Sequence, residues 1–291
     1  MRKQPLINWE ALAELFRPMP APPEAGGKTN PMGPKKGYGG WDNQANFYNQ
    51  MAQMEAGFTL NQLNCFDTSP EDTVLDVGCG PGRISVPMAK RAKSVTSLDA
   101  SPKMLECCME NAKKAGVNNI QTKLLDWLEE PIDSLEKHDI VIASRSVGMQ
   151  DIHKLSSLAK KYAVIVIWAF GYPSIPEIVG KLFKGTVDHM PGPPAPGRDR
   201  RLGNNLFYNR IYDLGYNPNL NIVEDGFTKI YDSKDEAYED LKTLRPDLPE
   251  EKMDIFKSNL ESFLTERQDG TIEFLAKTKS LVLWWKPEIE E

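Results

Sequence analysis

Residues 74–83 carry the residue types and the spacing that could hold a nucleotide-like ligand. The run reads Val-Leu-Asp-Val-Gly-Cys-Gly-Pro-Gly-Arg, so Asp76 leads into three alternate glycines, Gly78, Gly80 and Gly82. Glycine has no Cβ and tolerates positive φ, which lets the backbone approach a ligand closely. A helix that starts after such a turn offers free N–H groups and a positive partial charge. The run therefore predicts a strand, a tight turn and a helix start that together bind a polar ligand.

Two further acids follow at the ends of predicted strands. Asp99 ends the run 94–99, seventeen residues after Gly82. An acid about twenty positions past a glycine loop, at the carboxyl end of a strand, can accept hydrogen bonds from ribose hydroxyls. Its alternative role, capping the next helix, suits Ser101 better, because a proline follows that serine at the first helical position. Asp126 comes directly after another predicted strand, 120–125.

The glycine spacing is G-x-G-x-G rather than the G-x-G-x-x-G of dinucleotide-binding folds. With Asp76, Asp99 and Asp126 at these intervals, the chain resembles the class I S-adenosylmethionine-dependent methyltransferases, well over 74–170 and less closely as far as 287. The resemblance implies S-adenosylmethionine as the cofactor. It also implies a set of cofactor-binding residues: Asp76, Gly78, Cys79, Gly80, Gly82, Asp99, Ala100, Met104, Asp126, Trp127 and Ser144.

Within that set, the resemblance assigns the ribose to Asp99 and the adenine amino group to Asp126. Three of the residues have structural alternatives that stay open. The alternative for Asp126 is a surface turn residue, and Met104 and Trp127 are equally core residues.

These side chains need elements that alternate between strand and helix. The runs 139–144 and 162–170 are almost wholly apolar, which suits strands buried on both faces of a parallel sheet. Two more strands are predicted at 222–231 and 281–285. The alternation predicts an α/β fold, a Rossmann-like sheet of seven mostly parallel strands with helices on both faces.

The predicted organisation has two parts. Residues 1–66 form an N-terminal irregular and helical segment, with a helix over 41–66, which either covers the cofactor as a lid or packs against the sheet. Residues 67–291 form the methyltransferase domain. The acidic stretch 232–270 is predicted as a helical insertion between strands six and seven, either a two-helix cap or a dimer surface, and Asp269-Gly270 should end its second helix.

The catalytic residues stay unknown, because no pattern identifies a base. The candidates are His189, His153, Arg145 and Tyr172. Arg145 directly follows strand four and could bind an acceptor carboxylate or phosphate through its planar fork. We expect Arg145, Tyr172 and His189 to border one acceptor pocket together with Trp41.

Composition limits the partners. The net charge is -6, and residues 232–266 hold eleven acids against five bases. A nucleic-acid binder usually carries a basic face, so nucleic acid is an unlikely partner and a small molecule is the predicted acceptor. RNA or protein methylation, or S-adenosylmethionine binding without catalysis, are the alternatives. A second copy of the chain, forming a homodimer, is the other partner considered.

Other features bear on compartment and metal. No run is apolar for long enough to cross a membrane, and no secretory pattern follows the first residues. Four cysteines without a C-x-x-C pair predict a reduced, cytoplasmic protein. Cysteines and histidines show no metal-ligand spacing, so no metal is predicted.

Overall fold

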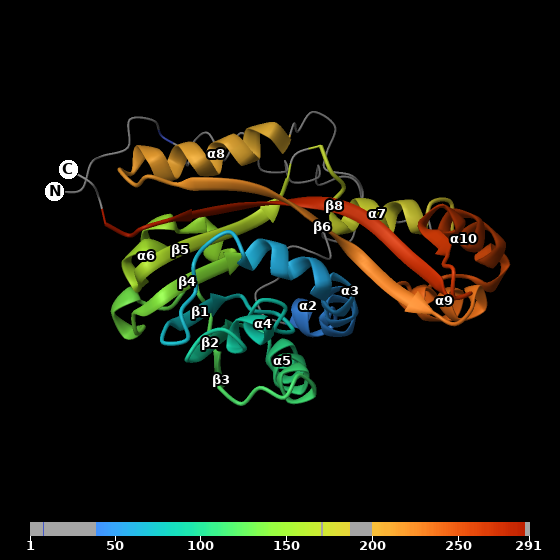
Figure 1. Ribbon diagram of the computed structural model, residues 1–291, viewed down its shortest axis with the longest axis horizontal. Helices are drawn as coiled ribbons and strands as arrows, with labels where there is room; N and C mark the ends of the chain where they lie inside the picture. The colour runs from blue at the N-terminus through green and yellow to red at the C-terminus, as the bar shows by residue number, and fades with distance from the viewer. Residues whose placement is uncertain (1–7, 9–38, 170, 187–199, 289–291) are drawn as a thin grey trace, which may run out of the picture.

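The computed structural model describes residues 8, 39–169, 171–186 and 200–288, and one sheet runs through the described part (Figure 1). Its strand order is β3-β2-β1-β4-β5-β8-β6. Five neighbouring strands are parallel: β1 (Thr73–Val77), β2 (Ser94–Asp99), β3 (Ile120–Leu124), β4 (His138–Ser144) and β5 (Ala159–Trp168). The antiparallel β8 (Ile272–Trp285) lies between β5 and β6 (Asn219–Tyr231). The predicted fold class is confirmed.

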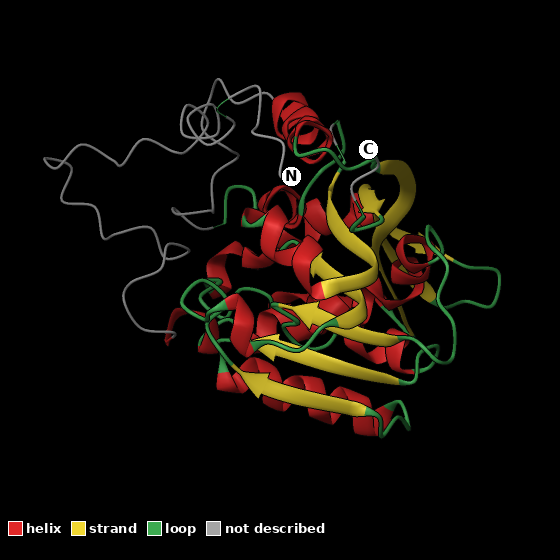
Figure 2. Ribbon diagram, turned by 90° about the vertical axis from the view of Figure 1, so that its left-hand side faces the viewer, coloured by secondary structure: helices red, strands yellow, loops and turns green. Residues whose placement is uncertain are grey.

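Alternate residues of the central strands enter two different cores. Leu75 and Val77 of β1 belong to one buried cluster, whereas Val74 belongs to the other. Helices α6 (Ile152–Leu158) and α8 (Arg200–Asp213) contribute to the first cluster. Helices α4 (Ser85–Ala89) and α5 (Pro102–Lys114) contribute to the second. Figure 2 shows helices on both sides of the strands. Burial on both faces explains why these strands read as continuous apolar runs.

The hairpin of β6 and β8 is longer than the sequence predicted. Its β8 begins at Ile272 rather than near 281, because residues 272–278 alternate between buried and more exposed positions and stay in register with β6. Helices α7 (Ile175–Leu182), α9 (Lys234–Lys242) and α10 (Met253–Leu260) pack near the far end of this hairpin (Figure 1).

The inserted region departs from the prediction in one detail. Its second helix, α10, ends at Leu260, well before the predicted stop at Asp269-Gly270. A 3-10 turn follows, and then the short strand β7 (Leu264–Glu266) pairs with β8. The predicted count of seven strands omitted β7, because three residues are too few to show a period.

From residue 39 on, the described N-terminal part has two helices, α2 (Gly39–Asp42) and α3 (Ala45–Leu63), in place of the single predicted helix over 41–66. Both contact α5, and α3 also packs along β6. Apart from Asn8, residues 1–38 of the predicted lid lie outside the described residues. No helix in the described part has both the length and the apolarity of a membrane span.

Candidate cofactor-binding site

The glycine loop leaves the carboxyl end of β1 with three left-handed glycines, at φ of 68° for Gly78, 54° for Gly80 and 85° for Gly82. A Cβ on Gly78 would lie 2.6 Å from the Ser146 Cβ, and one on Gly82 would lie 2.7 Å from the Cys108 Sγ. A Cβ on Gly80 would have the Met104 Sδ as its nearest neighbour, at 4.0 Å. The outer glycines are therefore needed for packing, while the space over Gly80 stays open to a ligand.

Asp99 holds this loop against the end of β2. Its Oδ2 accepts a hydrogen bond from the Gly80 N–H at 2.8 Å, and its Oδ1 accepts one from the Ser101 N–H at 2.9 Å. Burial raises the pKa of the Asp99 carboxyl. Each carboxylate oxygen has about two acceptor sites, so both oxygens keep capacity for ribose hydroxyls. Ser101 caps α5 as predicted, accepting from the Met104 N–H at 3.2 Å.

Asp76 lies beneath the loop rather than on its ligand side. Only 1% of the residue is exposed, and its Oδ2 accepts from the Ser85 hydroxyl at 2.6 Å. Ser85 in turn accepts from the Ser97 hydroxyl at 2.7 Å. Burial raises the pKa of Asp76 to about 6. In this arrangement Asp76 supports the start of α4 and has no surface for a direct cofactor contact.

Asp126 and Trp127 separate into different roles. The Asp126 carboxylate is half-buried and accepts from the Leu128 N–H at 3.0 Å. The Trp127 ring is 2% exposed and belongs to the core. Of the two roles left open for Trp127, cofactor contact or core, its burial favours the core.

Four charged side chains meet at the carboxyl ends of the central strands. Glu55 of α3 is 1% exposed and pairs with both Arg83 and Arg145, at 3.0 and 2.8 Å. Arg145 also pairs with the buried Asp225 of β6 at 2.6 Å. Two cations and two anions thus balance in the interior, and we call these four residues the buried quartet. Ser144, at the end of β4, accepts from Arg83.

Arg145 was a candidate ligand for a carboxylate or phosphate of the acceptor. In the structure its guanidinium is bound within the buried quartet instead. Arg145 gives Nη1 to Glu55 and Nη2 to Asp225, and its guanidinium carbon lies 3.2 Å from the Trp168 ring centroid. Arg145 also has a φ of 52°, in the region that non-glycine residues seldom adopt. Its charge is committed inside the fold, which argues against the predicted role in binding an acceptor carboxylate.

The remaining candidates each have contacts of their own. Tyr172 is exposed after β5, with the Lys279 Nζ at 5.0 Å from its ring centroid. His153 is on α6, with Nε2 at 3.3 Å from the Ser157 hydroxyl. Trp41 contacts Tyr48, and His189 lies outside the described residues. The predicted pocket shared by these side chains stays a prediction.

Three other predicted residues are placed near the loop. Cys79 and Met104 are buried and Ala100 is half-buried. Met104 faces the open side of Gly80, which fits a cofactor contact.

Sequence reasoning missed Glu55, Asp225 and Lys154. Glu55 shares a buried helical stripe with Met51 and Thr59, four residues to either side. An acid on the buried face of a predicted helix indicates an internal ion pair, and Glu55 could have been found in this way. Asp225 and Lys154 gave no comparable signal, because their partners are 80 and about 25 residues away.

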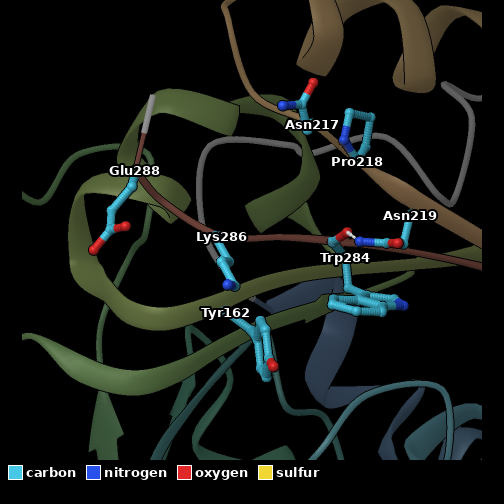
Figure 3. Close-up of a pocket in the computed structure, with 7 residues that line it drawn as sticks. All are labelled: Tyr162, Asn217, Pro218, Asn219, Trp284, Lys286 and Glu288. Atoms are coloured by element: carbon cyan, nitrogen blue, oxygen red, sulfur yellow. Dashed lines mark hydrogen bonds between the residues drawn. The ribbon is translucent and has the colours of Figure 1, made fainter. Parts of the chain in front are cut away.

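A hollow of about 320 Å³ lies at the opposite edge of the sheet, near the amino end of β5 (Figure 3). Tyr162 and Trp284 line it with Lys286. Because ligands of open α/β sheets bind at the carboxyl ends of the strands, we do not assign the cofactor to this hollow. Within the described residues no group of His, Cys, Asp and Glu side chains is arranged to hold a metal.

A family model described as "Methyltransferase domain" matches residues 68–166, the segment that contains the glycine loop, Asp99 and Asp126. Residues 68–166 are therefore a class I S-adenosylmethionine-dependent methyltransferase domain. The cofactor of this family is S-adenosylmethionine, and the open side of Gly80 and the spare acceptor sites of Asp99 fit it.

Relatives of this methyltransferase differ in what they are named for. An uncharacterized protein of Haemophilus influenzae is 26% identical over 84% of this chain and 88% of its own length. A probable cobalt-precorrin-6B C(15)-methyltransferase (decarboxylating) of Methanococcus maripaludis is 35% identical over 35% of this chain and 52% of that enzyme. A 23S rRNA (uracil(1939)-C(5))-methyltransferase of Alcanivorax borkumensis is 41% identical over 23% of this chain and 15% of that enzyme. The matches to named enzymes thus span about half of their length or less.

Proposed function

We propose that this methyltransferase transfers the methyl group of S-adenosylmethionine to a small-molecule acceptor. The observation that carries the cofactor part is the bond from the Gly80 N–H to the Asp99 carboxylate, which joins the glycine loop to the expected ribose acid. The acceptor part rests on the net charge of -6. A relative named for methylating a precorrin supports it.

Different residues would bind different parts of the cofactor. S-adenosylmethionine supplies, when bound, an electrophilic methyl group on a sulfonium. Asp99 would accept from the ribose hydroxyls and Asp126 from the adenine amino group, while the glycine loop would bring backbone close to the cofactor. Holding the acceptor in line with the methyl group can supply roughly 7–11 kcal/mol of barrier reduction.

The buried quartet has a positioning role in this proposal. Arg83 follows the glycine loop directly and donates to Ser144, while Arg145 follows β4. The quartet therefore fixes the loop after β1 relative to the turn after β4, where the acceptor would approach. Tyr172 and His153 remain candidates for contact with the acceptor.

RNA methylation is the second candidate, and one relative is named for it. That match covers only 23% of this chain. Such a length holds little beyond a cofactor-binding core, so it does not favour RNA as the acceptor. A cytoplasmic location and a homodimer also stay proposals, the first supported by four free cysteines.

Calorimetry followed by a transfer assay tests the proposal. We expect S-adenosylhomocysteine to bind and NAD not to bind. Tritiated methyl groups from S-adenosylmethionine should enter a small-molecule extract and not an RNA fraction. Tight NAD binding would refute the cofactor, label in RNA would refute the acceptor class, and binding without transfer to any fraction would favour a non-catalytic protein.

A further inference from the structure

Lys154 is a buried cation that the proposed mechanism does not use. It lies on α6 and is 7% exposed. Its Nζ donates to the backbone carbonyl of Trp127 at 2.5 Å and to that of Glu130 at 2.6 Å. The same Nζ lies 4.2 Å from the centroid of the Trp127 ring. A single ammonium thus contacts both ends of the turn over 127–130.

This turn is the one that presents Asp126. The Asp126 backbone carbonyl accepts from the N–H groups of Glu129 and Glu130, at 3.2 and 3.0 Å, and its carboxylate accepts from the Leu128 N–H. Just before the turn, the Leu125 N–H donates to the backbone carbonyl of Asp99 at 2.9 Å. The turn is therefore fixed to the strand that carries the ribose acid, on the side of Asp126.

On the other side the turn depends on α6. The Trp127 ring is in the core, and the ammonium of Lys154 satisfies two carbonyls that point into the protein. Asp151 caps α6 by accepting from the Lys154 N–H at 2.8 Å, which holds the lysine backbone in place. Burying an ammonium is costly unless its donors are all used. An apolar side chain would pack on Trp127 equally well but would leave both carbonyls without a donor.

We propose that Lys154 is a positioning residue that holds the turn over 127–130 so that Asp126, directly before it, reads the 6-amino group of adenine. The inference rests on the proposed cofactor role of Asp126. It adds that Lys154, by fixing the turn, fixes the orientation of the Asp126 carboxylate. Lys154 touches neither cofactor nor acceptor, so its effect passes through the turn.

The test compares two ligands that differ at the 6 position. Calorimetry measures the dissociation constants of S-adenosylhomocysteine and of its deaminated inosine analogue, which carries an oxygen in place of the amino group. We expect the wild type to prefer the adenine form at least tenfold, as for one hydrogen bond to a charged group. Lys154→Met should weaken binding of the adenine form about tenfold and change binding of the inosine form by less than about threefold.

Two further variants separate positioning from general damage. Adding Lys154→Met to Asp126→Asn should cause little additional loss, because the effect passes through Asp126. Lys160→Met removes an exposed lysine at the start of β5 and should change neither constant. If Lys154→Met does not fold, Lys154→Gln keeps a donor and should retain part of the preference.

Each other outcome refutes the inference. Equal weakening of both ligands by Lys154→Met would mean that the lysine only stabilises the fold. A wild type that binds both forms equally would mean that Asp126 does not read the amino group, although the cofactor proposal would stand. A wild type that binds neither form would overturn the cofactor proposal as well.

Discussion

Glu55 and Arg145 are 90 residues apart in the sequence, yet both oxygens of the Glu55 carboxylate accept from the Arg145 Nη1, at 2.8 and 3.0 Å. The bond connects the N-terminal helix α3 to the turn after β4. Because Glu55 also pairs with Arg83, one buried carboxylate bonds to two buried guanidinium groups. Removing it would leave both without their shared partner.

Glu55→Ala should lower the free energy of unfolding by about 3–5 kcal/mol, the range for breaking a buried pair from one side. Urea denaturation measures the change. The matched control is Glu239→Gln, which removes an exposed partner of Lys242 and should cost less than about 1 kcal/mol. A loss for Glu55→Ala no larger than that of the control would show that water enters the quartet freely.

Asp99→Ala should weaken binding of S-adenosylhomocysteine at least tenfold, because bonds from ribose hydroxyls to a carboxylate are charge-assisted. The variant also loses the acceptor for the Gly80 N–H, so thermal unfolding should be recorded beside calorimetry. Asp133→Ala, at an exposed position between β3 and β4, is the control. Unchanged affinity in a folded Asp99→Ala protein would reject the ribose role.

Gly78→Ala and Gly116→Ala separate crowding from backbone strain. The two glycines have nearly equal φ, 68° and 69°, but a Cβ would meet Ser146 only at position 78. Strain alone should cost about 1–2 kcal/mol at position 116, without effect on the cofactor. Gly78→Ala should cost more and should also weaken cofactor binding. Equal losses of stability at the two positions would mean that Ser146 moves aside easily.

The raised pKa of Asp76 predicts a pH dependence of stability. The folded pKa of about 6 lies above the ordinary value of 3.8, so the folded state binds this proton more tightly than the unfolded state. The stabilisation is fully present below about pH 4 and is lost as the pH rises to about 6, by an amount on the order of 2–3 kcal/mol.

Asp76→Asn removes this titration. Its unfolding free energy should fall less than that of the wild type between pH 4.5 and pH 7, and urea denaturation at the two values measures the difference. Parallel curves for the two proteins would mean that Asp76 stays ionised in the fold across this interval.

The central sheet and the cofactor loop follow from the sequence because their signals are local. Val74 to Gly82 hold an apolar run and three glycines within ten residues, and these form β1 and the left-handed turn after it as the pattern indicates. Trp127 and Arg145 could not be placed in that way. Their environments depend on α6, β6 and α3, whose distance along the chain hides the contact. Burial decides both cases, since an indole and a guanidinium each serve a ligand or a core equally well.

The packing of α3 restricts how the predicted lid over 1–66 could move. Met51 and Met54 of α3 share a buried cluster with α7, α9 and α10 at the far end of the β6–β8 hairpin. If α3 swung away from the sheet, it would open that cluster and separate the buried quartet in the same movement. We therefore expect α3 and the β6–β8 hairpin to move together as one rigid body. Any hinge near the cofactor then falls before Ala45, where the short α2 touches the start of α5 through Asp42 and Ser101.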